Sequence, residues 1–244
     1  MKKHVIKTLV LTAFFGLTFP SPVHADGWGG FERYAASNEQ LKKEKTDDRV
    51  VFIGNSITDH WFRDRTDFVA AHPNYVGRGI SGQTTYAFVT RFRQDVTELE
   101  PAVVVINGGI NDIAENSHPY NEDITFGHIQ TMIEQSIMHG SEVILTTLLP
   151  AARIPWRSEI ENTPEKIKSL NLRIRNVAML YSIPLVDYYT ALVAEDGVSL
   201  KSEYTDDGLH PNAEGYKVME ALVVPQIEEV LQRIKNGRSA GSKK

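Results

Sequence analysis

The chain has 244 residues, of which 41% are hydrophobic and 23% charged, a composition that can build the core of a soluble domain. Its formal net charge of −5 indicates no attraction to nucleic acid or anionic lipid, so we expect neither as a partner. Cysteine is absent, which excludes disulfides, thiol nucleophiles, iron–sulfur clusters and a cysteine lipid anchor.

The first segment of the chain has the pattern of an export signal. Three lysines precede an apolar stretch from Thr8 to Phe19, and Ala25 ends a Val-His-Ala sequence at which a signal peptidase could cut. The stretch is too short to span a bilayer, although a retained anchor or a buried N-terminal helix is the alternative. We therefore predict a removable signal over residues 1–25, a mature chain beginning at Asp26 with net charge −8, and a periplasmic or secreted protein without stable membrane insertion.

Beyond the signal, short apolar runs alternate with segments of helical spacing. The runs, rich in Val and Ile, predict strands at Arg49–Gly54, Tyr75–Ile80, Ala102–Asn107, Glu142–Leu149 and Ile183–Tyr188. Helices are predicted at Phe31–Lys45, Thr84–Leu99, Asn121–His139, from Thr163 through Tyr181, and at Asn212–Ile234. This alternation indicates one α/β domain over residues 26–235, a three-layer α/β/α sandwich with a flavodoxin-like parallel sheet of order 2-1-3-4-5. The small, polar and basic residues 236–244 predict a disordered tail.

The first candidate for chemistry is Ser56, in the sequence Gly-Asn-Ser at the end of the first predicted strand. Ligands of open α/β sheets bind beyond the carboxyl ends of the strands, and a serine on such a turn is exposed there. A serine in this position can also simply cap the helix that begins at Ile57.

Two glycine-containing turns follow the second and third predicted strands. Gly82 can direct a backbone N–H toward an oxyanion without an obstructing side chain, and Asn111 can donate a side-chain N–H to the same oxygen. Each turn is also compatible with a structural role alone.

The last candidate pair is Asp207 and His210, just before the final predicted helix. A serine hydroxyl needs a base to take its proton, and histidine titrates near neutrality. A carboxylate three residues earlier can reach the second ring nitrogen and hold its tautomer. Asp206 is an adjacent carboxylate with a longer spacing to His210. The strand order 2-1-3-4-5 would bring all four segments to one edge of the sheet.

These segments, in this order, resemble the SGNH hydrolases, also called GDSL-like lipases and acylhydrolases, and in particular the branch similar to platelet-activating-factor acetylhydrolase. The resemblance extends from about Arg49 to about Val218. It implies the SGNH hydrolase fold, Ser56 as nucleophile, His210 as base and Asp207 as its partner. It also implies an oxyanion hole made by the N–H groups of Ser56 and Gly82 and the side chain of Asn111, with no cofactor or metal. Asn55 departs from the family pattern, which usually has aspartate there.

The resemblance implies a serine esterase. The class of ester is predicted from candidate binding side chains, from export and from the acidic surface. Aromatic and basic side chains predicted near the same edge are candidates for substrate binding, namely Trp61, Tyr86, Arg153 and Trp156. Trp61 and Tyr86 are equally compatible with helix packing. Export and an acidic surface favour a short-chain or O-acetyl esterase acting on extracellular saccharides.

Several alternatives remain open from the sequence. A lysophospholipase or a thioesterase of the same family has the same site residues. A saccharide-binding module without catalysis has the same fold. A metal-dependent esterase or phosphatase is suggested only by Asp59 and His60 after Gly-Asn-Ser, without a second cluster of ligands.

Overall fold

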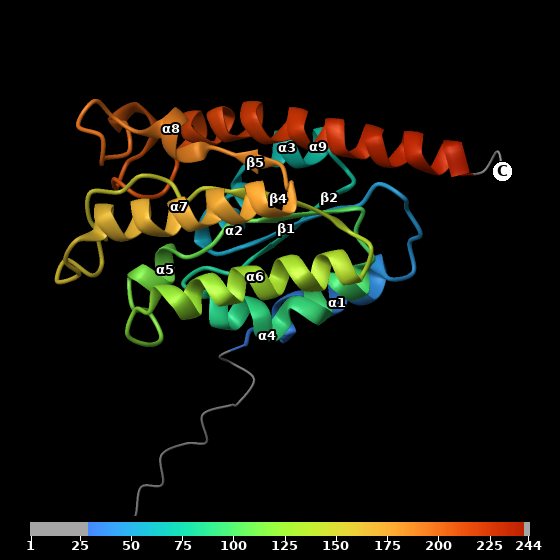
Figure 1. Ribbon diagram of the computed structural model, residues 1–244, viewed down its shortest axis with the longest axis horizontal. Helices are drawn as coiled ribbons and strands as arrows, with labels where there is room; N and C mark the ends of the chain where they lie inside the picture. The colour runs from blue at the N-terminus through green and yellow to red at the C-terminus, as the bar shows by residue number, and fades with distance from the viewer. Residues whose placement is uncertain (1–28, 242–244) are drawn as a thin grey trace, which may run out of the picture.

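A computed structural model describes residues 29–241, and the predicted signal over residues 1–25 lies outside that range. Five parallel strands form one sheet in the order β2-β1-β3-β4-β5, as predicted, with helices on both faces (Figure 1). The strands are β1 (Val50–Gly54), β2 (Tyr75–Gly79), β3 (Val103–Ile106), β4 (Glu142–Thr146) and β5 (Leu185–Val186). The longer helices are α1 (Glu32–Leu41), α2 (Ser56–Asp64), α4 (Thr85–Asp95), α6 (Glu122–Met138), α7 (Thr163–Tyr181) and α9 (Ala213–Gly241). The shorter ones are α3 (Thr66–Ala71), α5 (Ile110–Ile113) and α8 (Tyr188–Leu192), with 3₁₀ turns at Thr97–Leu99 and Ser202–Tyr204.

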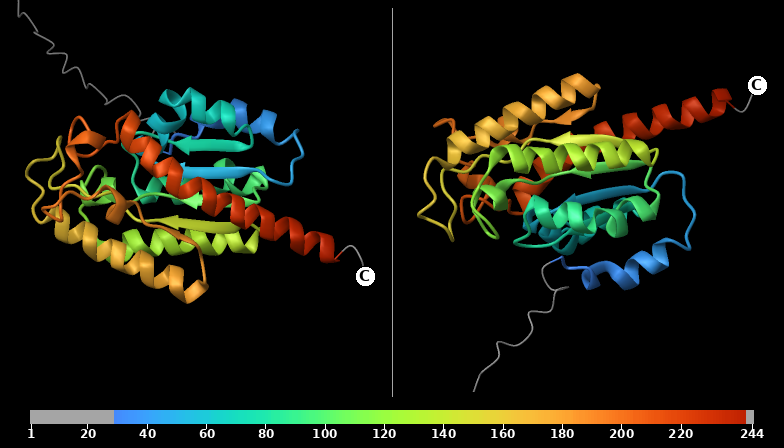
Figure 2. Two further views of the ribbon diagram at one scale, coloured as in Figure 1. Left: turned by 90° about the horizontal axis from the view of Figure 1, so that it is seen from above. Right: turned by 60° about the horizontal axis from the view of Figure 1, so that its bottom comes forward.

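The two faces of the sheet have separate hydrophobic cores. In β1, Val51 and Ile53 face one core while Val50 and Phe52 face the other, because successive side chains of a strand point to opposite faces. The first core is completed by α4, α6 and α7, and the second by α2, α3, α8 and α9. β1 has no exposed residue, which explains why its sequence lacks polar alternation. The strand arrows point the same way (Figure 2), so the carboxyl ends of all five strands share one edge.

Some predicted boundaries differ from the observed ones, for local reasons. The fifth strand is limited to two residues because Asp187 accepts a hydrogen bond from the backbone N–H of Thr190 (3.2 Å) and caps α8. The last helix is longer than predicted and includes residues 236–241 of the expected disordered tail. Each further residue of an established helix adds a backbone hydrogen bond, and Gln232 also donates to Asn236 (2.9 Å) along its surface.

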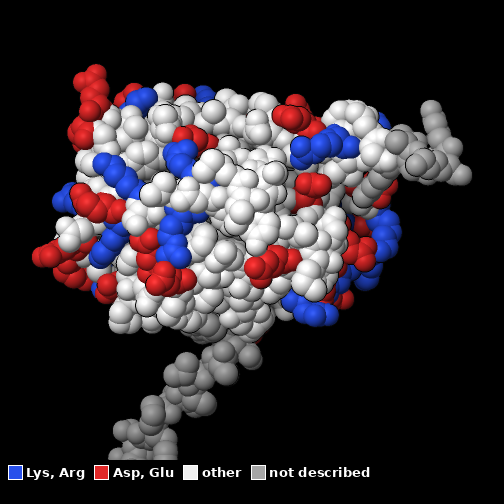
Figure 3. All heavy atoms as spheres, in the orientation of Figure 1, with Lys and Arg blue, Asp and Glu red and all other residues white. Residues whose placement is uncertain are grey.

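Charged side chains of both signs are interspersed on the face seen in Figure 3. Several form ion pairs between elements, such as Arg173 of α7 with Asp123 of α6 at 2.7 Å. Mixed charges of this kind give that face no field of a single sign. None of the helices within residues 29–241 has both the length and the apolar character needed to cross a bilayer.

Candidate active site

Ser56 lies where β1 ends and α2 begins, and its hydroxyl is not used as a helix cap. Asn55 caps α2 instead, because its side-chain oxygen accepts a hydrogen bond from the N–H of Ile57 (3.0 Å). The close turn also needs Gly54, where an added Cβ would lie 2.1 Å from the hydroxyl oxygen of Thr58. With the helix capped by its neighbour, the Ser56 hydroxyl is left to contact His210.

His210 bonds to Ser56 on one side and to Asp207 on the other. Its Nε2 lies 2.9 Å from the Ser56 Oγ, and its Nδ1 lies 2.7 Å from a carboxylate oxygen of Asp207. Since a carboxylate only accepts, Nδ1 carries the proton and Nε2 is free to accept one from the hydroxyl. This arrangement of nucleophile, base and orienting acid is suited to removing the serine proton.

The loop that carries His210 is held by its own polar groups. The second carboxylate oxygen of Asp207 accepts the backbone N–H groups of Leu209 (2.9 Å) and His210 (2.7 Å). Burial alone would raise the pKa of Asp207, but the hydrogen bonds from the His210 ring and from these N–H groups outweigh it and lower the pKa. Asp207 is therefore charged at neutral pH. Thr205 braces the same loop by donating to the His210 carbonyl at 2.7 Å.

The two predicted oxyanion turns lie beside each other. Gly82 has φ +80°, a conformation that favours glycine, and an added Cβ there would meet nothing within 4 Å. Asn111 is buried in α5, and its side-chain NH₂ donates to the carbonyl oxygen of Gln83 at 3.0 Å. Because an amide nitrogen carries two hydrogens, Asn111 retains one for a ligand.

Asp112, next to Asn111, is fully buried and fixes the start of α4. Its carboxylate accepts the backbone N–H of Thr85 (3.0 Å) and the hydroxyl of the same residue (2.6 Å). Burial raises the pKa of Asp112 in spite of these bonds. The contact ties the Asn111 turn to the residues that follow Gly82.

The four predicted substrate-binding residues have different surroundings. Trp61 is only 2% exposed, which makes that prediction wrong for this residue. It lies one helical turn after Ile57 on the inner face of α2, stacks on Phe68 (5.3 Å between ring centroids) and donates its indole N–H to Glu220 at 3.1 Å.

The other three are nearer the surface. Tyr86 is half-buried, and its ring contacts His118 and His128 at centroid distances of 3.9 and 4.3 Å. Trp156 is 43% exposed, and its ring stacks on that of His210, at 5.8 Å between centroids and 25° between planes. Arg153 is exposed and makes no hydrogen bond or ion pair within the described part of the chain. Of the four, Trp156 directly adjoins the Ser56–His210 pair.

The structure adds neighbours that the sequence analysis does not place at the site. His60 is one helical turn after Ser56, and its ring centroid lies 5.4 Å from that of His210. The four-residue spacing on α2 was the available signal for this contact. Burial is the main cause that lowers the pKa of His60, helped by the charges of Arg63 and His210. Asn116, which bonds to both Gly82 and Trp156, has no comparable signal in the sequence.

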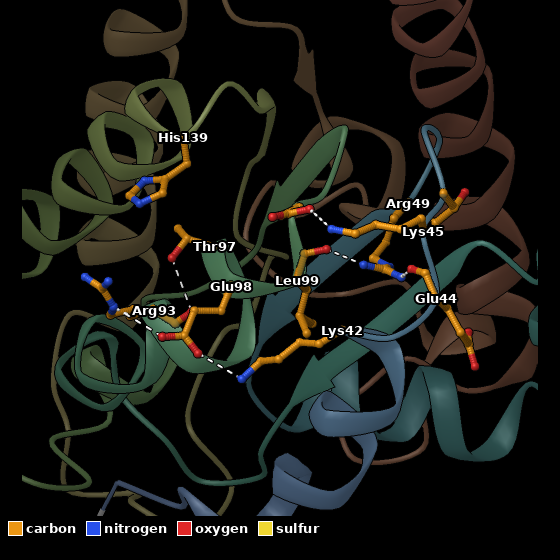
Figure 4. Close-up of a pocket in the computed structure, with 11 residues that line it drawn as sticks. Lys42, Glu44, Lys45, Arg49, Arg93, Thr97, Glu98, Leu99 and His139 are labelled. Carbon is orange, nitrogen blue, oxygen red and sulfur yellow. Dashed lines mark hydrogen bonds and ion pairs between the residues drawn. The ribbon is translucent and has the colours of Figure 1, made fainter.

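A hollow of about 530 Å³ lies at the opposite edge of the sheet, where the strands begin (Figure 4). Its charged side chains bind one another: Lys42 and Arg93 both contact Glu98, at 2.9 and 3.3 Å. Arg49 donates to the backbone carbonyls of Leu41 (2.8 Å) and Glu44 (2.7 Å). These groups form no nucleophile–base pair, so the candidate site is the one at the carboxyl ends of the strands.

Comparison with known proteins associates this geometry with one family. The profile of the GDSL-like Lipase/Acylhydrolase family matches residues 52–218. A GDSL-like lipase from Bacteroides thetaiotaomicron VPI-5482 is 50% identical to the chain, with a TM-score of 0.80. That alignment covers 83% of this chain and 98% of the other.

Two acetylxylan esterases are more distant relatives. The one from Xylanibacter ruminicola is 24% identical over 257 residues, covering 86% of this chain and 51% of that protein. The chain thus spans about half the length of this curated relative. The structure of the one from Geobacillus stearothermophilus is 19% identical with a TM-score of 0.61, covering 74% of this chain and 94% of the other, a likeness in fold alone.

Proposed function

The chain belongs to the GDSL-like lipase/acylhydrolase family, and on that premise we propose that it is a carboxylic ester hydrolase with Ser56 as its nucleophile. The observation that carries the proposal is the 2.9 Å contact between the Ser56 hydroxyl and His210, whose other nitrogen bonds to Asp207 at 2.7 Å. Each of the three side chains has the partner that its role requires.

The proposed reaction has two halves. In the first, the Ser56 oxygen forms a bond to the ester carbonyl carbon while His210 takes the hydroxyl proton. The resulting oxyanion accepts hydrogen bonds from the N–H groups of Ser56 and Gly82 and from the Asn111 side chain, and each such donor is worth about 10²–10³ in turnover. The ester C–O bond then breaks, and the alcohol leaves with the proton from His210.

In the second half, water replaces the alcohol. His210 takes a proton from a water molecule while the water oxygen bonds to the acyl carbon. The proton then passes to the Ser56 oxygen when the acyl–enzyme bond breaks. The products are the free acid and the regenerated hydroxyl. Asp207 remains a carboxylate throughout and stabilises the imidazolium, in agreement with its lowered pKa.

For the substrate, we propose short-chain or O-acetyl esters of saccharides. An apolar cavity beside the site, lined by Ile57, Leu148 and Leu209 among others, has a volume of about 10 Å³. This is room for roughly one water molecule, so the apolar packing next to Ser56 and His210 leaves no space for a long acyl chain there. The exposed ring of Trp156 can pack on a sugar face, and Arg153 can pair with a carboxylate on the saccharide. The acetylxylan esterase from Xylanibacter ruminicola, a relative in sequence, supports the same class.

A fluorophosphonate probe tests the nucleophile directly. We expect it to label the wild type and the control Ser169→Ala, an exposed serine on α7, but not Ser56→Ala. Labelling of Ser56→Ala, or none of the folded wild type, would contradict the proposal, and the second result would favour a saccharide-binding module. Activity that survives a metal chelator would separate this mechanism from a metal-dependent one.

Substrate class is tested with p-nitrophenyl esters of two to twelve carbons and with an acetylated polysaccharide. We expect the highest kcat/KM for the acetyl ester and release of acetate from the polysaccharide. A preference for long chains would favour the lysophospholipase or thioesterase alternative.

For the location of the protein, we propose export, because the sequence predicts a removable signal over residues 1–25. Sequencing of the mature N-terminus tests this, and a start at Asp26 would support it.

A further inference from the structure

The side chain of Asn116 connects two parts of the site that are distant in sequence. Its NH₂ group donates to the carbonyl oxygen of Gly82 (3.1 Å), and its carbonyl oxygen accepts the indole N–H of Trp156 (3.0 Å). Its own backbone N–H donates to the carbonyl of Asn111 at 3.1 Å. Both ends of the amide are therefore used, one on the proposed oxyanion turn and one on the aromatic ring beside the base.

The ring that Asn116 holds is in contact with the imidazole. Trp156 stacks on His210 with 25° between the ring planes and 5.8 Å between centroids, and His60 approaches His210 at 5.4 Å. The contacts Gly82–Asn116–Trp156–His210 thus run from the oxyanion turn to the base, which bonds to Ser56 at 2.9 Å. We call the two side-chain hydrogen bonds of Asn116 the Asn116 bridge.

The direction in which a side chain of Gly82 would point is open. A Cβ added at this residue would meet nothing within 4 Å, and the backbone has a φ of +80°. The Asn116 bridge therefore supplies a restraint on the peptide that packing does not. Trp156 is 43% exposed, and the hydrogen bond from its indole nitrogen to Asn116 restrains the ring that stacks on His210.

We propose that Asn116 and Trp156 are positioning residues that hold the oxyanion turn and His210 in register with Ser56. This inference rests on the proposed function, because register matters only if an oxyanion forms at that turn. A misplacement of about 1 Å can cost about 10² in rate, so two exposed hydrogen bonds can influence turnover more than stability.

Trp156 also bears on the charge of the base. An imidazolium within about 6 Å of an indole centroid is stabilised by the ring. The titratable groups that face the His210 ring are Asp207 on its own loop and His60 on α2, which is adjacent to Asp59 and Arg63. Neither substitution removes one of these groups, so both variants keep the charges that face the imidazole.

Three variants separate the two halves of the bridge. Trp156→Phe keeps a ring over His210 and loses the indole N–H, Asn116→Ala loses both hydrogen bonds, and the third variant combines them. With p-nitrophenyl acetate, which has no sugar to pack on Trp156, we expect kcat to fall about threefold for Trp156→Phe and about tenfold for Asn116→Ala. KM should change less than about twofold, since one hydrogen bond is worth about twofold to tenfold. Asn176→Ala, an exposed asparagine on α7, is the matched control and should retain wild-type kcat.

The double variant is the decisive measurement. Because both substitutions remove the same Trp156–Asn116 bond, the combined loss should be about that of Asn116→Ala alone. Losses that multiply to about thirtyfold, or an Asn116→Ala variant with unchanged kcat, would overturn the inference.

Indole fluorescence gives a readout that does not depend on turnover. A protonated imidazole quenches an indole in contact with it, so emission of the wild type should fall on acidification. The change should be absent from Trp156→Phe and from His210→Asn, and smaller in Asn116→Ala, where the ring is less restrained. An unchanged amplitude in Asn116→Ala overturns the bridge. Absence of ester hydrolysis by the wild type, with the fluorescence change intact, would instead contradict the proposed function.

Discussion

Replacing Asp207 by asparagine tests how the carboxylate controls the base. One oxygen of Asp207 accepts the backbone N–H groups of Leu209 and His210, and the other accepts the His210 ring N–H at 2.7 Å. Asparagine has the same shape but only one acceptor oxygen. It can satisfy the two backbone groups or the ring, not both, and an NH₂ group facing the ring favours the tautomer in which Nε2 carries the proton.

The expected loss follows from that tautomer and from the lost charge. In the Ser-His-Asp triad of serine proteases, the equivalent substitution lowers kcat about 10⁴-fold, with a fully buried aspartate. The side chain of Asp207 is 42% exposed, so water weakens its interaction with the imidazolium. We therefore expect a loss in kcat of about 10²–10³, with KM nearly unchanged because Asp207 does not contact the substrate.

Steady-state hydrolysis of p-nitrophenyl acetate measures this loss. Asp206→Asn is the matched control, because Asp206 is the adjacent, exposed carboxylate. This substitution removes the same charge from the loop. Its kcat should stay within about twofold of the wild type, as surface charges are screened. A kcat for Asp207→Asn above a third of the wild-type value would refute the reasoning, as would equal losses in the two variants.

Two further predictions concern stability. Trp61→Ala should lower the free energy of unfolding by about 3–5 kcal/mol, because it leaves a cavity in the core, and urea denaturation would measure it; a loss below about 1 kcal/mol would contradict the buried placement. Burial alone would raise the pKa of Asp187, but hydrogen bonds from Thr190 and Arg175 lower it below 3.8. The contribution of this carboxylate to the free energy of unfolding is therefore present at neutral pH and is lost as the pH falls through its pKa in the folded protein. The stability gap between the wild type and Asp187→Asn should therefore close below about pH 4 in a urea series, and a gap independent of pH would be evidence against this assignment.

Local patterns in the sequence were sufficient for the architecture. The apolar runs predicted all five strands, because a strand buried on both faces of a parallel sheet has no polar alternation. The three-residue spacing of Asp207 and His210 predicted their contact, since one turn of backbone is enough to join them. Boundaries were less predictable: the fifth strand ends early because of a single cap at Asp187.

The sequence therefore determined the strands, the helices and the residues that the turns carry, all of which depend on periodicity and short-range spacing, while the expected strand order and family followed from the resemblance of its motifs to SGNH hydrolases. Only the tertiary structure decided which side chains those turns bring together. Ser56 could have capped its helix, but His210 reaches it from 154 residues away while Asn55 takes the cap. Trp61 and Trp156 are the same residue type near the same edge, yet one is 2% exposed and the other 43%. The rings of Phe52 in β1 and Phe68 in α3 pack on Trp61 together with Tyr216 from the distant α9, and packing between separate elements leaves no periodic trace in the chain.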